Sequence, residues 1–157
     1  MKEEKTNAIR ILEKTKISFE AINYEPDENI DAISVAAKLG EDASVVYKTL
    51  ITQGKTRQYY VFVIPADAEL DLKAAARAVG EKSVEMIPVK EINAVSGYIR
   101  GGCSPVGMKK QFKTVIDKSA ETLPLFFVSG GRRGTQLKLC PKELSKLIGA
   151  GFSDIVL

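Results

Sequence analysis

Two neighbouring runs of β-branched and aromatic residues constrain the fold of this chain most strongly. The runs are Tyr47–Gln53 and Gln58–Ile64, and only the segment GKTR separates them. Such residues favour extended backbone, and a short loop with glycine and polar residues favours a tight reversal of the chain. The pattern therefore predicts a β-hairpin in the first half of the chain.

The segments around the hairpin alternate irregularly between helical and extended patterns. Helices are expected after Thr6, at Ile33–Leu39, at Asp71–Val79, from Pro88 to Val95 and from Pro141 to Gly149. Strands are expected at Ile17–Tyr24, Ser83–Ile87, Lys113–Asp117, Leu125–Val128 and Thr135–Leu139, with an edge strand at Phe152–Val156. Because regular βαβ alternation is missing, we expect the α+β class, with a mixed, mostly antiparallel sheet that curls toward a barrel among surrounding helices.

Length and composition favour one domain over residues 1–157. Of the 157 residues, 45% are hydrophobic and 27% are charged, which suits a sizeable core and argues against a disordered or fibrous chain. No apolar run approaches the roughly 20 residues that span a bilayer, and MKEEKTNAIR lacks the apolar segment of a signal peptide. We therefore expect a cytoplasmic protein without a membrane partner.

The chain contains no histidine and only two cysteines, Cys103 and Cys140. The lack of histidine excludes Ser-His-Asp and Cys-His nucleophilic systems and any imidazole acid or base. Two cysteines are too few for a disulfide framework or a four-ligand zinc site. Catalysis would have to use lysine, carboxylates, hydroxyls, backbone amides or the substrate itself, and we expect neither a metal nor a cofactor.

Positive charge is concentrated in the second part of the chain. Residues 1–96 hold 13 basic and 16 acidic side chains, whereas residues 97–157 hold 10 basic and 4 acidic ones, a net charge of +6. Many of these cations lie in or near glycine-rich segments, an arrangement that suits a passing polyanion. The alternative is a solvated basic face without a ligand.

The segment GYIRGGCSPVGMKK, residues 97–110, gathers four glycines and a proline. Glycines leave backbone N–H groups uncovered, so the segment can present donors to a carbonyl oxygen or a phosphate. The alternative is an ordinary connecting loop.

Lys48 is unusual because it lies inside the first strand of the predicted hairpin. With the period of two of a strand, it shares a face with Leu50 and Thr52. A strongly hydrated ammonium in that position suits a strand that lines a cleft. The alternative, which this pattern alone favours, is an edge-strand lysine whose ammonium reaches out to water.

Neither glycine-rich segment is a standard nucleotide-binding motif. Gly102 and Gly107 have the spacing of a P-loop, but Met108 stands where the lysine should follow. GGRRG, residues 130–134, is not the GxGxxG of a dinucleotide fold. A Cys103 nucleophile would need the loop amides or a nearby cation to lower its pKa, so a small packed side chain is the simpler interpretation.

Four motifs in order resemble the YbaK/EbsC family of Cys-tRNA(Pro) deacylases: NYEPD, VYKTL, the loop Gly-Tyr-x-x-Gly-Gly-x-Ser-Pro-x-Gly-x-Lys-Lys, and VSGGRRG followed by a strand. The resemblance covers nearly the whole chain. This family is similar to the editing domain inserted in bacterial prolyl-tRNA synthetases, and the resemblance implies its curled mixed sheet with surrounding helices.

The resemblance also implies roles for individual residues. The expected catalytic residues are Lys48, Gly101, Gly102 and Ser129. The expected substrate-binding residues are Tyr24, Tyr98, Cys103, Ser104, Pro105, Gly130 and Gly131. The concentration of positive charge near these loops, and not the resemblance, selects the expected tRNA-binding residues Lys109, Lys110, Arg132 and Arg133.

In this family the substrate's own cysteinyl thiol is proposed to attack its ester, so the enzyme supplies no nucleophile. The resemblance therefore implies a trans-editing deacylase that acts on mischarged Cys-tRNA(Pro), with prolyl-tRNA synthetase as an expected partner. Cys103 occupies a variable position of the loop, which weakens a catalytic role for it. Two alternatives remain: an Ala-tRNA(Pro) deacylase on the same scaffold, and a non-enzymatic module that binds aminoacyl or nucleotide ends.

Overall fold

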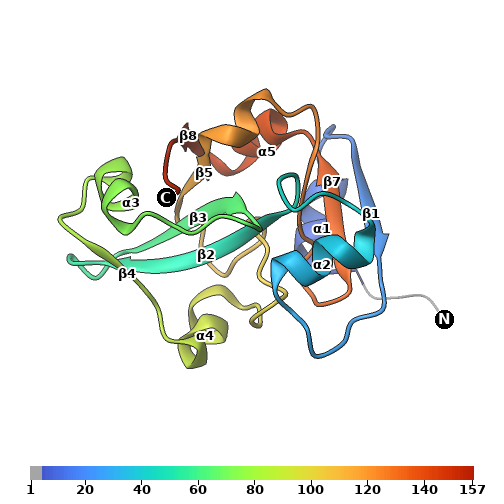
Figure 1. Cartoon of the computed structure of the whole chain (residues 1–157), viewed down its shortest axis with the longest axis horizontal. Helices are drawn as coiled ribbons and strands as arrows, with labels where there is room; N and C mark the ends of the chain where they lie inside the picture. The colour runs from blue at the N-terminus through green and yellow to red at the C-terminus, as the bar shows by residue number, and fades with distance from the viewer. Residues whose placement is uncertain (1–4) are drawn as a thin grey trace.

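The predicted hairpin forms the middle of the larger of two sheets. The computed structural model describes residues 5–157, and in it β2 (Tyr47–Gly54) pairs antiparallel with β3 (Tyr59–Pro65). The register places Lys48 opposite Ile64 and Gln53 opposite Tyr59. Figure 1 shows this hairpin running across the molecule, so that its two ends contribute to different parts of the surface.

The larger sheet is mixed and the smaller one is antiparallel, so that most ladders are antiparallel, as expected for the α+β class. The larger sheet has the order β4-β2-β3-β5-β8, and the smaller one has the order β1-β7-β6. The added strands are β4 (Val84–Met86), β5 (Lys113–Asp117), β8 (Gly151–Ser153), β1 (Phe19–Asn23), β7 (Thr135–Leu139) and β6 (Phe126–Ser129). Four ladders are antiparallel, and only β3–β5 and β5–β8 are parallel.

The expected curl of one sheet toward a barrel is not observed. Within residues 5–157 the strands form two separate sheets, which are linked by a single parallel bridge between Val46 and Phe127. Beside this bridge, the Phe127 amide donates to the Val45 carbonyl, and the Ala66 amide donates to the Val46 carbonyl. In Figure 1, β1 and β7 consequently run up the view whereas β2 and β3 run across it.

The helices begin and end close to where caps and prolines predict. They are α1 (Asn7–Glu13), α2 (Ala32–Leu39), α3 (Leu72–Val79), α4 (Ile92–Ser96), α5 (Pro141–Ile148) and the 3-10 helices η1 (Val89–Glu91) and η2 (Lys118–Thr122). The side chains of Thr6, Asp31 and Asp71 accept hydrogen bonds from the first turns of α1, α2 and α3. The sequence did not predict η2. No helix among residues 5–157 has the length and apolar character needed to span a membrane.

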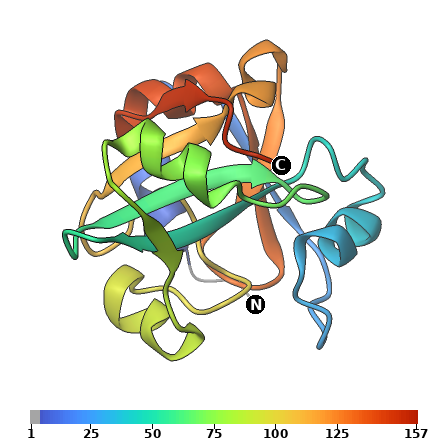
Figure 2. The same cartoon turned by 60° about the vertical axis from the view of Figure 1, so that its left-hand side comes forward.

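Three apolar clusters hold these elements together. The largest lies between the two sheets and includes residues of α1 and α5, the second packs α3 on one face of β2 and β3, and the third lies under α2. Figure 2 shows α3 lying over the hairpin, with α4 on the other side of it. α3 therefore packs on the hairpin, and a bridge at Val46, just before β2, reaches the smaller sheet.

A buried polar network fixes the start of β2. The Tyr47 hydroxyl lies 2.7 Å from Ser119 Oγ, and the Asp117 carboxylate accepts hydrogen bonds from Ser119 and from the Ile155 amide. Asp117 is only 2% exposed and its bond with the Ile155 amide is buried, whereas Ser119 lies at the surface. The network joins β5, η2 and the C-terminal segment to the residue that precedes Lys48.

We predict that Asp117→Ala lowers the free energy of unfolding by about 2–3 kcal/mol, because it leaves the buried Ile155 amide and the Ser119 hydroxyl without their acceptor. Denaturant unfolding measures the loss. Asp154→Ala is the matched control, since Asp154 is exposed and near the same segment, and it should change stability by less than about 0.5 kcal/mol. Equal stability of the two variants would contradict this account of the network.

Candidate active site

A cavity of about 470 Å³ opens where the two sheets meet. Its walls come from the start of β2, the N-terminal part of α2, the segment from β4 to α4, the loop around Gly101 and the adjacent ends of β6 and β7. Most of the lining is aliphatic, and a small number of polar groups interrupt it. Concave, mostly apolar cavities with a few placed polar groups are typical of small-molecule and substrate sites.

Lys48 lines this cavity, on the part of β2 that precedes the residues paired with β4. It is half-buried, and its Nζ donates a hydrogen bond of 3.2 Å to the Ala66 carbonyl. It forms no ion pair with any described residue. An ammonium has three donor protons, so this geometry leaves donor capacity for a ligand.

Burial lowers the pKa of Lys48, because desolvation disfavours the charged ammonium. The carboxylates of Glu69, Asp67 and Asp31 act in the opposite direction from a distance. The cavity therefore contains a cation that lacks a strong partner, which is an arrangement that favours binding of a polarised carbonyl or an oxyanion.

The first glycine-rich loop reaches the cavity at Gly101 and Cys103, whose amides donate to no other described residue. The Gly102 amide is engaged, since it donates to the Ile99 carbonyl at 2.9 Å. A Cβ atom on Gly102 would lie 2.9 Å from Arg132 Cα, closer than real Cβ contacts allow. The sequence predicted backbone donors at Gly101 and Gly102. The geometry instead favours the amides of Gly101 and Cys103 as donors. Gly102 allows the two loops to pack closely.

Tyr98 holds the two glycine-rich loops together. It is 7% exposed, its hydroxyl donates to the Val106 carbonyl at 2.6 Å, and a Cβ atom on Gly131 would lie 3.0 Å from its ring. Burial raises the pKa of Tyr98 to about 12. Tyr98 is not among the residues that line the cavity, so the geometry favours a positioning role over the substrate contact expected for it.

Ser104 and Pro105 are also buried behind the cavity wall. Ser104 is fully buried, and its Oγ accepts a hydrogen bond from the Val106 amide at 3.2 Å. Neither residue lines the cavity. Their contacts stiffen the loop, and the direct substrate contacts expected for them remain predictions.

The second glycine-rich loop contributes Ser129, the last residue of β6. Ser129 lines the cavity, and its Oγ accepts a hydrogen bond from the Gly131 amide at 3.2 Å. The Gly130 amide donates to the Thr135 carbonyl at 2.9 Å. Gly130 and Gly131 are absent from the cavity lining, so their geometry supports a role in turning the chain and placing the Ser129 hydroxyl.

Two polar residues that sequence reasoning did not select also face this site. Gln136 and Thr49 line the cavity, and Gln136 Oε1 and Thr49 Oγ1 are buried without a hydrogen-bond partner among the described residues. Gln136 pairs with Ser129 across β6 and β7 and is only 5% exposed. Buried polar groups are normally paired, so these two atoms are candidates for contact with a ligand. For Gln136, the sequence feature that could have indicated this role is a polar side chain in the strand directly after the second glycine-rich loop.

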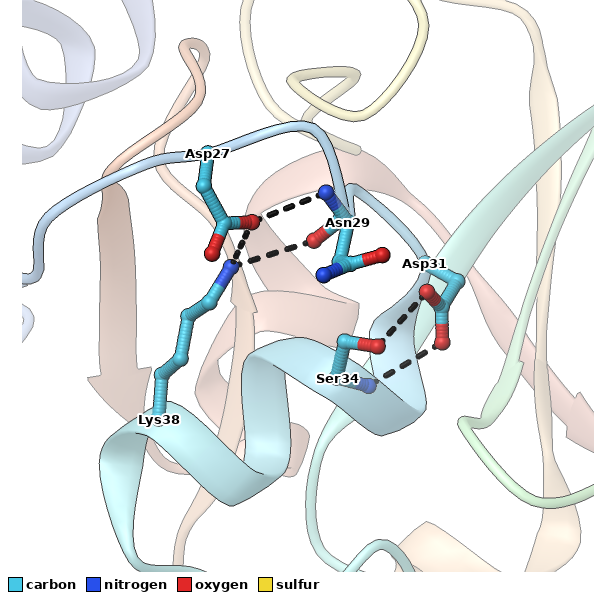
Figure 3. A network of polar contacts seen from close by, with 5 residues as sticks. All are labelled: Asp27, Asn29, Asp31, Ser34 and Lys38. Carbon is cyan, nitrogen blue, oxygen red and sulfur yellow. Dashed lines mark hydrogen bonds and ion pairs between the residues drawn. The ribbon is translucent and has the colours of Figure 1, made fainter.

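A polar network holds one rim of the cavity in place (Figure 3). Asp31 caps α2 by accepting from the amide and hydroxyl of Ser34, and it also lines the cavity. Lys38 bonds to Asp27 and to the Asn29 carbonyl. These contacts lower the pKa of Asp27, mainly through Lys38, and fix the segment before α2.

Cys103 has the properties of a packed thiol. Desolvation raises its pKa to about 11, although a hydrogen bond with Ser96 opposes the shift. The thiol is therefore protonated near neutral pH, and a thiol is a far weaker nucleophile than a thiolate. No group of His, Cys, Asp and Glu side chains within residues 5–157 is arranged to hold a metal ion.

The remaining predicted residues do not line this cavity. The Tyr24 amide donates to the Gly134 carbonyl at the end of β1. Lys109 Nζ donates to the Ala94 carbonyl, and Lys110 is exposed.

Arg132 and Arg133 brace the loops. Arg132 Nε donates to Thr135 Oγ1 at 2.9 Å, and Arg133 Nε donates to the Arg100 carbonyl at 2.9 Å. At least one nitrogen of each guanidinium therefore has a structural partner, and the tRNA contacts expected for these residues remain predictions.

Residues 27–147 match the family described as "Aminoacyl-tRNA editing domain". The chain belongs to this family. The matched region contains the cavity walls contributed by β2, α4 and both glycine-rich loops, and the family predicted from the four motifs is confirmed.

Three known proteins are similar to this editing domain. A protein of Enterococcus faecalis named "Putative Cys-tRNA(Pro)/Cys-tRNA(Cys) deacylase EbsC" is 42% identical over 98% of this chain and 94% of its own. A Proline--tRNA ligase of Trichlorobacter lovleyi is 26% identical over 82% of this chain and 24% of its own. A solved structure described as "a putative trans-editing enzyme for prolyl tRNA synthetase" has the same fold, with a TM-score of 0.84 at 24% identity over 99% of both chains.

We predict that Gly102→Ala lowers kcat/KM by about 10- to 100-fold, because the new Cβ must separate the two loops and displace groups around the cavity. Steady-state deacylation of a mischarged tRNA measures the effect. Gly151→Ala is the control, since no atom lies within 4 Å of its added Cβ. Wild-type kinetics in Gly102→Ala would show that close loop contact is not needed for activity.

Proposed function

We propose that this editing domain removes cysteine from mischarged Cys-tRNA(Pro). The observation that carries the proposal is a half-buried Lys48 without an ion-pair partner, in a cavity that also contains uncommitted loop amides. The relative that is 42% identical supports the choice of a cysteinyl ester. The cavity would hold the aminoacyl group and part of the terminal adenosine.

Lys48 and the amides of Gly101 and Cys103 would stabilise the negative charge that develops on the ester carbonyl oxygen. All three residues line the cavity. Lys48 forms no ion pair with a described residue, and the two amides donate to no described residue. Removing one donor from such a site typically costs a factor of about 10² to 10³ in rate. Lys48 therefore acts as an electrostatic group in this mechanism.

The nucleophile would be the thiol of the substrate. Its sulfur loses a proton and bonds to the carbonyl carbon, and the ester bond to the ribose oxygen breaks. That ribose oxygen takes up a proton, and the product is a cyclic cysteine thiolactone, which water later opens to free cysteine. The high effective concentration of an internal nucleophile removes the need for a protein base.

The side chains of the protein support a substrate nucleophile, because none of them is suited to attack the ester. Burial raises the pKa of the Cys103 thiol to about 11, and the sequence has no histidine to activate it. Deacylation of an alanyl ester on the same scaffold would instead require water as the nucleophile, because alanine carries no side-chain nucleophile. The rate ratio between cysteinyl and alanyl esters distinguishes these substrates.

Prolyl-tRNA synthetase is the proposed partner that supplies tRNA identity. Support comes from the relationship to a segment of Proline--tRNA ligase that spans 24% of that protein. A free-standing editing domain that acts in trans can use the anticodon recognition of the synthetase. Strong discrimination between tRNA(Pro) and tRNA(Cys) by the isolated protein would contradict this part of the proposal.

We predict that Lys48→Met lowers kcat by about 10²- to 10³-fold while the protein stays folded, because it removes the cation and keeps an apolar stem. Lys48→Arg should also fail, since a planar guanidinium cannot replace a compact ammonium without displacing the ester. Cys103→Ala is the matched control from the same cavity and should keep most of the activity. Wild-type turnover in Lys48→Met would remove this residue from the mechanism.

The pH dependence of kcat/KM provides a second measurement on the same variants. The rate should rise as the substrate thiol ionises and fall as Lys48 loses its proton. Because burial lowers the pKa of Lys48, the falling limb should lie below the ordinary lysine value of about 10.4. After spontaneous ester hydrolysis is subtracted, the kcat/KM profile of Lys48→Met should not fall at high pH, because the titrating lysine is gone.

We predict that Ser-tRNA(Pro) reacts far more slowly than Cys-tRNA(Pro), although both esters fit the cavity. A hydroxyl is a much weaker nucleophile than a thiol near neutral pH. Rapid quenching of the cysteinyl reaction should trap the thiolactone before free cysteine accumulates. Equal rates for the two esters would rule out the substrate-assisted route and leave the deacylase proposal standing with water as the nucleophile.

A further inference from the structure

A second cavity lies at the turn end of the β2–β3 hairpin, away from the candidate active site. Its volume is about 560 Å³, and five of its lining residues define what we call the basic groove: Arg57, Tyr59, Lys110, Phe112 and Lys113. They come from the hairpin turn and from the segment that leads into β5.

The three cations of the basic groove lack protein counter-ions. Arg57, Lys110 and Lys113 are exposed and form no ion pair with any residue from 5 to 157. The Glu81 carboxylate accepts hydrogen bonds from the Thr56 amide and the Tyr60 hydroxyl and does not line the groove. Three uncompensated positive charges around one concavity favour an anionic ligand with more than one charge.

The aromatic residues give the groove a second property. The rings of Tyr59 and Phe112 meet edge to face with centroids 5.6 Å apart, and both side chains are half-buried. Cations interleaved with partly exposed rings are typical of surfaces that bind a nucleic-acid strand, since phosphates contact the cations and a base stacks on a ring.

Arg57 occupies a conformation that its side chain does not favour. Its φ is +74°, the only positive φ of a non-glycine residue among residues 5–157. Glycine adopts this conformation without steric cost, whereas other residues with a Cβ rarely do. The turn thus holds an arginine where glycine would be relaxed, which makes Arg57 a candidate for a functional role.

The basic groove lies within reach of a strand that enters the candidate active site. Gln53, opposite Tyr59, is five residues from Lys48 along β2, so the two sites are separated by about 17 Å at 3.4 Å per residue. Lys109 contacts the Ala94 carbonyl of α4, the helix whose Ile92 lines the first cavity, and the next residue, Lys110, lines the groove. A few nucleotides of extended RNA can cover this distance.

We infer that the basic groove binds the backbone of the tRNA acceptor end while the 3'-terminal ester occupies the cavity at Lys48. The inference rests on the proposed function, because it takes a tRNA as the substrate. Phosphates contact Arg57, Lys110 and Lys113, and one base stacks on Tyr59 or Phe112. The groove therefore contributes to binding of the tRNA acceptor end and not to the chemical step.

Fluorescence anisotropy with uncharged, 5'-labelled tRNA(Pro) tests binding directly. Lys113→Glu should raise Kd about tenfold at 0.1 M salt and reduce the slope of log Kd against log salt by about 1. Arg57→Gly should also raise Kd, while its melting temperature stays equal to or above that of the wild type. Lys142→Glu, an exposed charge reversal on α5, is the control and should bind like the wild type.

Deacylation kinetics separate the groove from the chemistry. For Lys113→Glu and Arg57→Gly, the ratio of KM for Cys-tRNA(Pro) to KM for the cysteinyl ester of adenosine should rise, because a single nucleoside is too short to reach the groove from the first cavity. The inference is overturned if both variants bind tRNA within twofold of the wild type, or if this ratio is unchanged. A different outcome is that the two variants lose tRNA binding while the wild-type protein deacylates neither ester. That outcome would contradict the proposed function and still support the groove.

Discussion

The candidate active site depends on direct backbone contact between two loops. Gly102 lies against the Arg132 backbone, and no side chain separates the two segments. Tyr98 lies with its ring beside Gly131 of the second loop, and its hydroxyl donates a buried hydrogen bond to Val106 within the first loop. Because these contacts involve backbone and a rigid ring, they fix the amide of Gly101 relative to the hydroxyl of Ser129. Donors that are fixed before the reaction stabilise developing charge without the cost of reorganisation.

Lys48 shows how a cation can remain reactive inside an apolar wall. A close carboxylate would keep the ammonium charged but would also occupy its donors. Asp31, Asp67 and Glu69 instead act from a distance, while the Ala66 carbonyl provides one direct hydrogen bond. Desolvation lowers the pKa of the lysine, and the distant carboxylates limit that shift. The site thus keeps a positive charge with capacity for a substrate oxygen.

Local patterns predicted much of the fold, whereas contacts distant in sequence did not follow from them. The hairpin, the positions of α2 and α3 and the place of Lys48 on a strand followed from residue patterns, whereas the Asp31 cap of α2 was not predicted. The parallel pairing of β3 with β5 and the break into two sheets depend on long-range packing, which periodicity does not encode. Periodicity also placed Gln136 on the opposite face from Leu137, yet could not show that this face borders a cavity. The hydrogen bond from the Gly102 amide to the Ile99 carbonyl within the same loop could likewise not be predicted from the sequence.

The size of the cavity fits selection by chemistry better than selection by shape. A close-fitting apolar pocket separates small side chains by only about 1–3 kcal/mol per methylene. The cavity, at about 470 Å³ with a mostly aliphatic wall, does not restrict a cysteinyl group to one tight position. If the substrate supplies the nucleophile, a prolyl ester that enters the same space survives because it has no side-chain group that can attack its carbonyl. Protection of the correct product then depends on the missing histidine and the protonated Cys103, since a strong protein nucleophile or base would cleave both esters.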